Sequence, residues 1–285
     1  MPHSGILCVG AGGQLGRALA DLGVPGLTRA ELDLRDAAAV VAHPGIAAAA
    51  AVINCAAYTD VDGAEADPAA AWAVNRDGAA HLARACAAAG TRLVHVSTDY
   101  VFGGAAAAGA PADPAGRAPL PVDAPTAPET VYGASKLAGE RAVRAAAGDH
   151  LVVRTAWVFN GRERDFVSAM VRLAAGDAPV RVVADQHGNP TYVRDLAAGL
   201  LQAARGAARG TVHCTGSGAT TWYGLARAVF ARIGADPDRV RPCTTAEFPR
   251  PAPRPAWSVL DGSSWTAAGL DPLPGWRDGL ARALP

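Results

Sequence analysis

Short apolar stretches alternate with longer alanine-rich stretches through the first half of the chain. The apolar stretches are brief and almost continuous, as in strands that are covered on both faces of a sheet. The stretches between them have the length of crossover helices, so their order predicts parallel strands. The expected strands are residues 5–9, 52–55, 92–96 and 150–154, and the expected helices include residues 68–89 and 131–147.

The loop after the third expected strand and the C-terminal part of the chain follow different patterns. Residues 103–128 are rich in Ala, Pro and Gly without a period, and their prolines exclude a regular helix, so we expect an exposed loop. After residue 161 the apolar pattern loosens and reaches a proline-rich segment at 243–255. We predict an α/β fold: a Rossmann-type doubly wound parallel sheet with a smaller C-terminal substrate-binding lobe.

Composition and charge narrow the classes of partner. Half of the 285 residues are apolar, and 26 basic residues balance 26 acidic ones, so the formal net charge is zero. A chain of this length and composition buries a sizeable core, which excludes disordered and fibrous proteins. The charge balance argues against nucleic acid or a membrane surface as the main partner and favours a small molecule.

The cysteines and the apolar runs bear on metal binding and location. The five cysteines are scattered, without a Cys-x-x-Cys pair or an accompanying His cluster, so neither a zinc site nor a disulfide framework is indicated. No secretory leader is recognisable, and the apolar runs are much shorter than the ~20 residues that span a bilayer. We expect a cytoplasmic protein without a metal site.

A glycine-rich turn follows the first expected strand and leads into a helix. It reads Gly10-Ala11-Gly12-Gly13-Gln14-Leu15-Gly16. Glycines at these positions permit a tight turn, close approach of the backbone to a pyrophosphate and close helix packing, with the phosphate at the positive helix end. The Gly-x-x-Gly-x-x-Gly spacing is typical of short-chain dehydrogenases, although a strand-to-helix turn also uses glycine for structural reasons alone. We expect residues 1–160 to form an NAD(P)-binding domain, with some later segments returning to it, and residues 161–285 to form mainly the lobe.

Tyr132 and Lys136 stand four residues apart on an expected helix. This spacing places both side chains on one face, with Cβ atoms roughly 5–6 Å apart. An ammonium at that distance favours the phenolate and should lower the phenol pKa from about 10 toward neutrality. A tyrosine tuned in this way exchanges protons at working pH. The alternative is a structural pair on a solvated helix.

Hydroxyl groups and a carboxylate gather just beyond the third expected strand, in residues 95–102. Ligands of open α/β sheets bind at this edge, although Ser97, Thr98 and Asp99 could instead cap the strand end. Together with the tyrosine and lysine they form a carbonyl-reduction constellation. Thr98 would hydrogen-bond the carbonyl oxygen, Tyr132 would donate the proton, and Lys136 would tune the phenol and hold the nicotinamide ribose.

Specific motifs extend along nearly the whole chain. They comprise residues 10–16, 31–34, 52–62, 97–102, 132–140, 154–159 and 185–191, then 215–218 with Trp222 and Tyr223, and Arg254 and Pro255 with Ser258 and Leu260. The motifs at 97–102 and 185–191 lie outside the generic signature of the short-chain dehydrogenase/reductase superfamily. On these motifs the sequence resembles the dTDP-4-dehydrorhamnose reductase family of that superfamily.

The resemblance implies hydride transfer from NAD(P)H to C4 of dTDP-4-dehydro-6-deoxy-L-mannose, which yields dTDP-L-rhamnose. It implies that Thr98, Tyr132 and Lys136 are catalytic. The implied cofactor residues are Gly10, Gly12, Gly13, Gln14, Leu15, Arg29, Asp33, Leu34, Ala56, Ala57, Tyr58, Ser97, Tyr132 and Lys136. The implied substrate residues are Thr59, Val61, Thr98, Asp99, Trp157 and Arg254. For Trp157 the alternative is packing in the core.

Cofactor preference depends on the end of the second strand, where an acidic residue grips the 2′-hydroxyl of NAD and a basic one accepts the 2′-phosphate of NADP. The chain reads Leu27-Thr28-Arg29 there. Arg29 therefore favours NADPH, and NADH is the alternative if Arg29 is a solvated surface residue.

Two departures from the family pattern affect assembly and specificity. Some members dimerise around a magnesium ion held by glutamates, but the corresponding neighbourhoods here read Arg17-Ala18-Leu19 and Tyr192-Val193-Arg194-Asp195. We expect no such metal and favour a monomer over a homodimer. The long segment 103–128 and the residues Trp257 and Val259 lie where they could alter sugar specificity.

Two competing hypotheses remain at this point. One is a related ketoreductase that acts on another nucleotide-linked 4-keto-6-deoxysugar of an antibiotic or deoxysugar pathway. The other is a non-catalytic regulatory subunit that keeps the fold. The intact Thr98, Tyr132 and Lys136 argue against the second.

Overall fold

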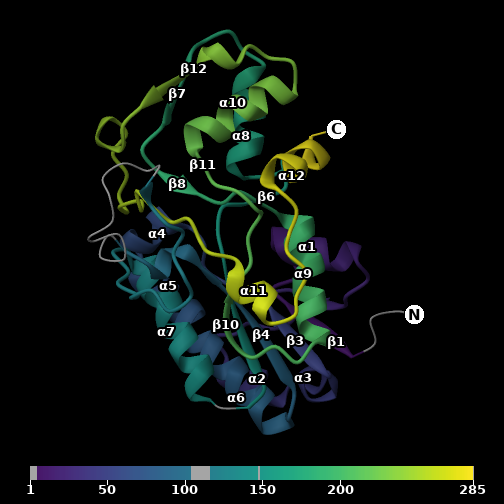
Figure 1. Ribbon diagram of the computed structural model, residues 1–285. Helices are drawn as coiled ribbons and strands as arrows, with labels where there is room; N and C mark the ends of the chain where they lie inside the picture. The colour runs from purple at the N-terminus through teal and green to yellow at the C-terminus, as the bar shows by residue number, and fades with distance from the viewer. Residues whose placement is uncertain (1–4, 104–115, 147, 285) are drawn as a thin grey trace.

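The computed structural model describes residues 5–103, 116–146 and 148–284. Within these residues, six parallel strands form one sheet in the order β10-β5-β4-β3-β1-β2, which confirms the α/β fold (Figure 1). The strands are β1 (Ile6–Val9), β2 (Gly26–Leu27), β3 (Ala51–Asn54), β4 (Arg92–Thr98), β5 (His150–Thr155) and β10 (Gly210–His213).

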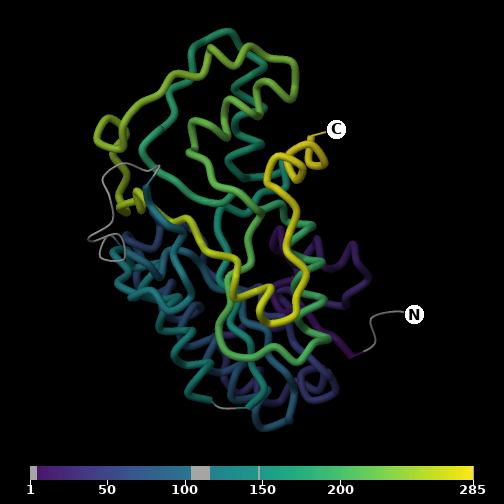
Figure 2. Tube along the Cα trace, in the orientation of Figure 1, coloured from purple at the N-terminus to yellow at the C-terminus, as the bar shows by residue number. Residues whose placement is uncertain are grey.

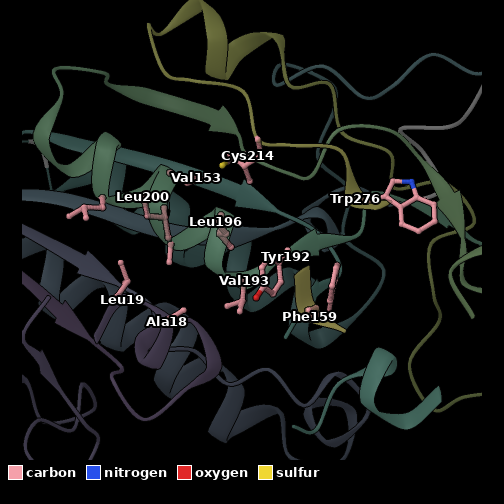
Figure 3. Packing of buried hydrophobic residues seen from close by; sticks show 14 of the residues in the cluster. Ala18, Leu19, Val153, Phe159, Tyr192, Val193, Leu196, Leu200, Cys214 and Trp276 are labelled. Atoms are coloured by element: carbon pink, nitrogen blue, oxygen red, sulfur yellow. The ribbon is translucent and has the colours of Figure 1, made fainter. Parts of the chain in front are cut away.

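Two helices cover one face of this sheet. They are α1 (Gln14–Asp21) and α9 (Val193–Arg205), and their apolar side chains interlock with alternate strand residues (Figure 3). The layer includes Cys8, Ile53 and Val153 from the strands and Leu19, Leu196 and Leu200 from the helices. Because α9 and β10 come after residue 161, part of the later chain returns to the sheet. The domain boundary between residues 160 and 161 stays a prediction.

The intervening strand residues face a second layer of helices. This layer consists of α2 (Ala37–Ala42), α3 (Pro44–Ala48), α6 (Ala79–Ala89) and α7 (Val131–Ala145). Its buried residues include Val9, Val52 and Val152 from the strands and Val40, Ile46, Leu82 and Val143 from the helices. Strands with apolar residues on both faces explain the continuous apolar runs in the sequence.

The rest of the later chain forms a smaller lobe beyond the carboxyl edge of the sheet (Figure 1). Figure 2 shows the C-terminal chain running from this lobe down to the sheet. It then turns back and ends beside the lobe. None of the helices within the described ranges is long and apolar enough to cross a membrane. The elements of the lobe are β6 (Val158–Phe159), α8 (Phe166–Ala174), β7 (Val180–Val183), β8 (His187–Gly188), β9 (Thr191–Tyr192), β11 (Thr220–Thr221), α10 (Trp222–Arg232), β12 (Val240–Cys243) and α12 (Trp276–Ala283). Outside the lobe, α11 (Ser263–Ala267) packs against β10 of the sheet, and its Ser264 hydroxyl accepts from the His213 N–H at 3.0 Å.

The expected helix at residues 68–89 contains a wider turn. It consists of α5 (Pro68–Trp72), a π-helical turn at Ala73–Gly78, and α6. Such turns are rare and often occur at functional sites. Of the expected loop at 103–128, residues 104–115 lie outside the described ranges; further along it, the Leu120 N–H donates to the Val259 carbonyl at 2.7 Å.

A buried ion-pair network joins α7 to the sheet. Glu140 of α7 is fully buried and accepts two hydrogen bonds from Arg154 of β5, both at 2.9 Å. It also accepts from Ser97 Oγ at 2.7 Å and from Arg144 at 3.1 Å. Burial acts to raise the pKa of Glu140, but the hydrogen bonds and charge of Arg154 outweigh it and lower that pKa. The network therefore holds α7 at one position on the sheet.

Replacing Glu140 by Gln removes the negative charge and leaves the buried Arg154 guanidinium without its counter-charge. Breaking a buried pair in this way typically costs ~3–5 kcal/mol, so we expect the free energy of unfolding to fall by that order at neutral pH. Urea denaturation followed by circular dichroism measures the loss.

The effect of Glu140→Gln should depend on pH. Because the pKa of Glu140 lies below its ordinary 4.5 in the folded chain, its charge stabilises the fold above that pH, and this contribution disappears as the pH falls through the folded pKa. The difference between wild type and variant should therefore shrink in acid. Glu163→Gln removes an exposed partner of Arg17 and is the matched control, with an expected cost below ~1 kcal/mol. Equal losses in the two variants would contradict the role of Glu140.

Candidate active site

The glycine-rich turn between β1 and α1 packs tightly against the neighbouring backbone on one side and has open space on the other. Gly10 has a φ of +92°, and a Cβ there would lie 2.5 Å from the Ala56 nitrogen, so only glycine fits. A Cβ at Gly12, in contrast, would meet no described atom within 4 Å. Among the described residues no side chain caps α1 at Gly13, so its first N–H groups are available at the positive helix end. This cradle fits a dinucleotide pyrophosphate.

Two adjoining cavities contain nearly all of the predicted site residues. The smaller, about 260 Å³, lies beside the glycine-rich turn, and the larger, about 480 Å³, lies over the carboxyl end of β4. They share Gly13, Cys55 and Ala57. The predicted residues that line the smaller are Gly10, Gly12, Gly13, Arg29, Asp33, Leu34, Ala56, Ala57 and Tyr58. Those that line the larger are Gly13, Gln14, Leu15, Ala57, Thr59, Val61, Ser97, Thr98, Asp99, Tyr132, Lys136 and Trp157.

The start of α7 carries the tyrosine and the lysine. Thr130 caps the helix, because its side chain accepts a hydrogen bond from the Gly133 N–H at 2.9 Å. Lys136, one turn later than Tyr132, donates from Nζ to the Val96 carbonyl of β4 at 2.7 Å. This bond ties the lysine to the strand that ends with Thr98. The structure thus brings Thr98, Tyr132 and Lys136 to one cavity.

The expected fall in the phenol pKa is wrong for this structure. Burial raises the pKa of Tyr132 to about 12, and the nearby Asp99 charge adds to the rise, while a hydrogen bond with the Thr98 side chain acts in the opposite direction. The spacing of Tyr132 and Lys136 along the helix determines how near the ammonium lies, but it does not reveal the loss of water around the phenol. Burial also lowers the pKa of Lys136 to about 8, against the charge of Glu140, which raises it. Tyr132 is therefore a protonated donor at neutral pH.

Asp99 places a carboxylate in the larger cavity. Its Oδ1 accepts a hydrogen bond from Thr98 Oγ1 at 3.0 Å, whereas its buried Oδ2 has no partner among the described residues. Burial raises the pKa of Asp99 to about 6. Buried oxygens are almost always hydrogen-bonded, so Oδ2 is suited to accept from a ligand hydroxyl. Ser97 differs, because its hydroxyl is already engaged by Glu140.

Asn75 is a positioning residue that the sequence analysis missed. It lies on the π-helical turn, accepts from the Tyr58 N–H at 2.8 Å and donates to the Tyr58 carbonyl at 3.1 Å. Its Nδ2 also donates to Ser135 Oγ at 3.0 Å, and Ser135 in turn donates to the Tyr132 carbonyl at 2.8 Å. Asn75 thus joins the loop after β3 to the start of α7. The available signal was that Asn75 is the only carboxamide side chain in the alanine-rich stretch 68–89.

Arg29 lies at the rim of the smaller cavity. Its side chain is 73% exposed and its Nε is 3.6 Å from Asp33 Oδ2. Asp33 also accepts hydrogen bonds from Arg35, and these lower the pKa of Asp33 to about 2. The exposed guanidinium is free to turn toward a phosphate at this rim.

Arg254 stands apart from the other predicted substrate residues. It lines neither cavity; its Nη2 binds Asp62 at 2.9 Å, and Arg250 binds the same carboxylate at 2.6 Å. Asp62 belongs to α4 (Val61–Ala66), so the two arginines attach the C-terminal segment next to Val61. Trp157, in contrast, is half-buried, lines the larger cavity and stacks on Trp222.

The neighbourhoods where some family members hold magnesium contain ion pairs. Arg194 binds Asp21 at 3.0 Å, and Asp195 binds Arg282 at 2.6 Å. Over the described ranges no group of three or more His, Cys, Asp or Glu residues is arranged to hold a metal ion. The absence of a magnesium site stays a prediction from the sequence.

Comparison with known proteins agrees with this geometry. The chain matches the family described as the RmlD substrate binding domain over residues 4–285. It is 52% identical to the dTDP-4-dehydrorhamnose reductase of Mycobacterium tuberculosis, covering 98% of this chain and 92% of that protein. It is 43% identical to a probable dTDP-4,6-dihydroxy-2-methyloxan-3-one 4-ketoreductase of Streptomyces antibioticus, covering 98% and 94%.

A solved structure gives the same result for the fold. The dTDP-4-dehydrorhamnose reductase of Bacillus anthracis, in complex with NADP, superposes with a TM-score of 0.88 at 32% identity and covers 97% of each chain. The chain therefore belongs to the dTDP-4-dehydrorhamnose reductase family of the short-chain dehydrogenase/reductase superfamily.

Proposed function

We propose that the protein reduces the C4 ketone of dTDP-4-dehydrorhamnose with NADPH and forms dTDP-L-rhamnose. The observation that carries the proposal is the convergence of Thr98, Tyr132 and Lys136 on one cavity that adjoins the glycine-rich cradle. Family membership supports the same reaction, because relatives across the full length carry that name.

The cradle and the smaller cavity would hold the cofactor. The N–H groups at the start of α1 would bind the pyrophosphate, and Ala56, Ala57 and Tyr58 would line the path toward Lys136. Arg29 would pair with the 2′-phosphate. When bound, NADPH supplies the hydride to C4. Asn75 holds in place the backbone of Tyr58, which lines the smaller cavity beside the cradle.

Proton transfer falls to Tyr132. As the ketone carbon gains a hydride, its oxygen gains negative charge; the Tyr132 O–H bond breaks and the proton moves to that oxygen. Thr98 hydrogen-bonds the same oxygen and the Lys136 ammonium stabilises the phenolate left behind. A phenol whose pKa is raised to about 12 holds its proton until the oxygen becomes basic enough to take it.

The substrate would occupy the rest of the larger cavity. Thr59, Val61, Asp99 and Trp157 line it together with Tyr132. The unpartnered Asp99 Oδ2 would accept from a sugar hydroxyl. Arg254, attached to Asp62 beside Val61, would approach the diphosphate from the edge of this cavity. The monomeric state and the cytoplasmic location stay predictions from the sequence.

A second candidate function is reduction of another dTDP-linked 4-keto sugar. The Streptomyces antibioticus relative carries such a name at 43% identity. An assay that generates the 4-keto sugars enzymatically from dTDP-glucose, follows NADPH loss and identifies the product stereochemistry separates the two. Formation of dTDP-L-rhamnose at the higher kcat/KM supports the first function, and preference for another sugar supports the second.

Tyr132→Phe should leave NADPH binding nearly unchanged and lower kcat at least ~10²-fold, because general acid catalysis typically contributes 10²–10⁴. Fluorescence titration measures NADPH binding and the coupled assay measures turnover. Tyr223→Phe, on α10 and outside both cavities, is the matched control and should turn over at the wild-type rate. Reduction by Tyr132→Phe at that same rate would refute the assigned role.

Arg29→Asp should raise KM for NADPH and leave KM for NADH equal or lower, since a carboxylate repels the 2′-phosphate and can grip a 2′-hydroxyl. Steady-state kinetics with each cofactor measure the shift. Arg84→Asp makes the same charge change on α6, outside both cavities, and should leave the NADPH to NADH ratio unaltered. An unaltered ratio in Arg29→Asp would remove Arg29 from the phosphate site.

The pH profile of kcat/KM should fall above about pH 8, because the pKa of Lys136 lies near 8 and its ammonium is lost above that value. Glu140→Gln removes a charge that raises the pKa of Lys136, so the alkaline limb should move to lower pH. Rates measured across the alkaline range test both statements. A profile that stays level well above the Lys136 pKa would contradict them.

A further inference from the structure

Trp157 has a backbone conformation that aromatic residues rarely adopt. Its φ is +47°, and among the described residues it is the only non-glycine residue with a positive φ. It lies two residues after the end of β5, at the carboxyl edge where the larger cavity lies. A bulky residue in the left-handed region persists only where its surroundings hold it there, and such residues cluster at functional sites.

Two neighbours hold the Trp157 indole. Trp222 stacks on it, with ring centroids 3.6 Å apart and planes 7° from parallel. Gly188 of β8 lies against the ring as well: an added Cβ would come closest to Cε2, 2.6 Å from Nε1 and 2.7 Å from Cζ2. These similar distances place Gly188 over a ring face. The Trp222 ring, stacked 3.6 Å from the Trp157 ring, leaves no room for another group on that face of Trp157. Gly188 and Trp222 therefore cover opposite faces of the Trp157 indole.

An indole covered on both faces can present only its edge to the cavity. Trp157 and Trp222 are both half-buried and both line the cavity that contains Tyr132. Trp157 Nε1 donates no hydrogen bond to any described residue, whereas Trp257 and Trp265 donate from Nε1 to backbone carbonyls at 3.2 and 2.7 Å. The edge of the indole is therefore the part of Trp157 that a ligand in this cavity can contact.

Trp222 is itself fixed by the lobe. It opens α10, which is capped where the Thr221 side chain accepts from the Gly224 N–H at 2.9 Å. Phe166, the first residue of α8, packs against it with ring centroids 4.6 Å apart. The stack thus couples the lobe to the end of β5. Moving or deleting the Trp222 ring would free one face of Trp157 and let its indole turn.

We propose that Trp222 is a positioning residue that holds Trp157 edge-on to the sugar of the dTDP-linked substrate. This inference rests on the proposed reductase function. Trp222 acts through Trp157, and the pair recognises the sugar.

Trp222→Ala should raise KM for the 4-keto sugar nucleotide about tenfold or more, with KM for NADPH unchanged. Trp222→Phe keeps a ring in the stack and should recover most of that loss. The near-ultraviolet circular dichroism of the coupled indoles should disappear in Trp222→Ala. An unchanged KM for the sugar nucleotide, with the indole signal gone, would overturn the proposal.

A double-variant cycle tests whether Trp222 acts through Trp157. If it does, Trp157→Ala with Trp222→Ala should bind the sugar nucleotide no worse than Trp157→Ala alone, because the second change has nothing left to disturb. Additive losses would show that Trp222 acts independently and would overturn the positioning role.

Trp276→Phe is the matched control. Trp276 also opens a helix, α12, but is buried and lines neither cavity, so its replacement should lower thermal stability without raising KM for the sugar nucleotide. Titration of all variants with dTDP-L-rhamnose separates the two proposals. Weaker binding to Trp222→Ala in a protein that does not reduce dTDP-4-dehydrorhamnose would refute the proposed function alone, whereas equal binding would refute the role of Trp222 alone.

Discussion

The whole site depends on how one helix is attached to one sheet edge. α7 supplies Tyr132 and Lys136, and β4 supplies Thr98. The Glu140 carboxylate of α7 joins the helix to the sheet because it accepts hydrogen bonds from Ser97 of β4 and Arg154 of β5. Sliding α7 along the sheet would leave buried charges unpaired, which is far more costly than losing apolar contact. A charged network under the site therefore fixes its geometry more sharply than packing alone.

The same burial that fixes the geometry also sets the chemistry. Loss of water raises the pKa of Tyr132 to about 12 and lowers that of Lys136 to about 8, so the phenol holds its proton more tightly than the ammonium does, although the two are nearly equal in solution. The phenol remains a donor, and the ammonium stands ready to stabilise the anion that the phenol becomes. The charge of Glu140 limits the fall in the pKa of Lys136. One carboxylate therefore both attaches α7 to the sheet and helps to keep Lys136 protonated.

Local features of the site were predictable from the sequence, and features that depend on distant contacts were not. The glycine-rich turn, the apolar strands and the Tyr132–Lys136 spacing each lie within a short stretch, where periodicity and residue type suffice. The π-helical turn was not predicted, because an α-helical and a π-helical turn in this stretch share one hydrophobic pattern. The pKa of Tyr132 depends on burial that its neighbours in sequence do not reveal. Arg254 finds its partner, Asp62, in a distant part of the chain.

The strand order has a consequence for how the chain matures on the ribosome. β5 is complete by Thr155, yet β10, the strand that pairs with its open edge, begins only at Gly210. The helix α9, which covers one face of the sheet, ends a few residues before β10 begins. During synthesis the nascent sheet must therefore expose a bare edge and an uncovered apolar face until that later region emerges. Such surfaces invite pairing with other chains. The order of the strands thus sets how long the growing chain keeps this edge unpaired.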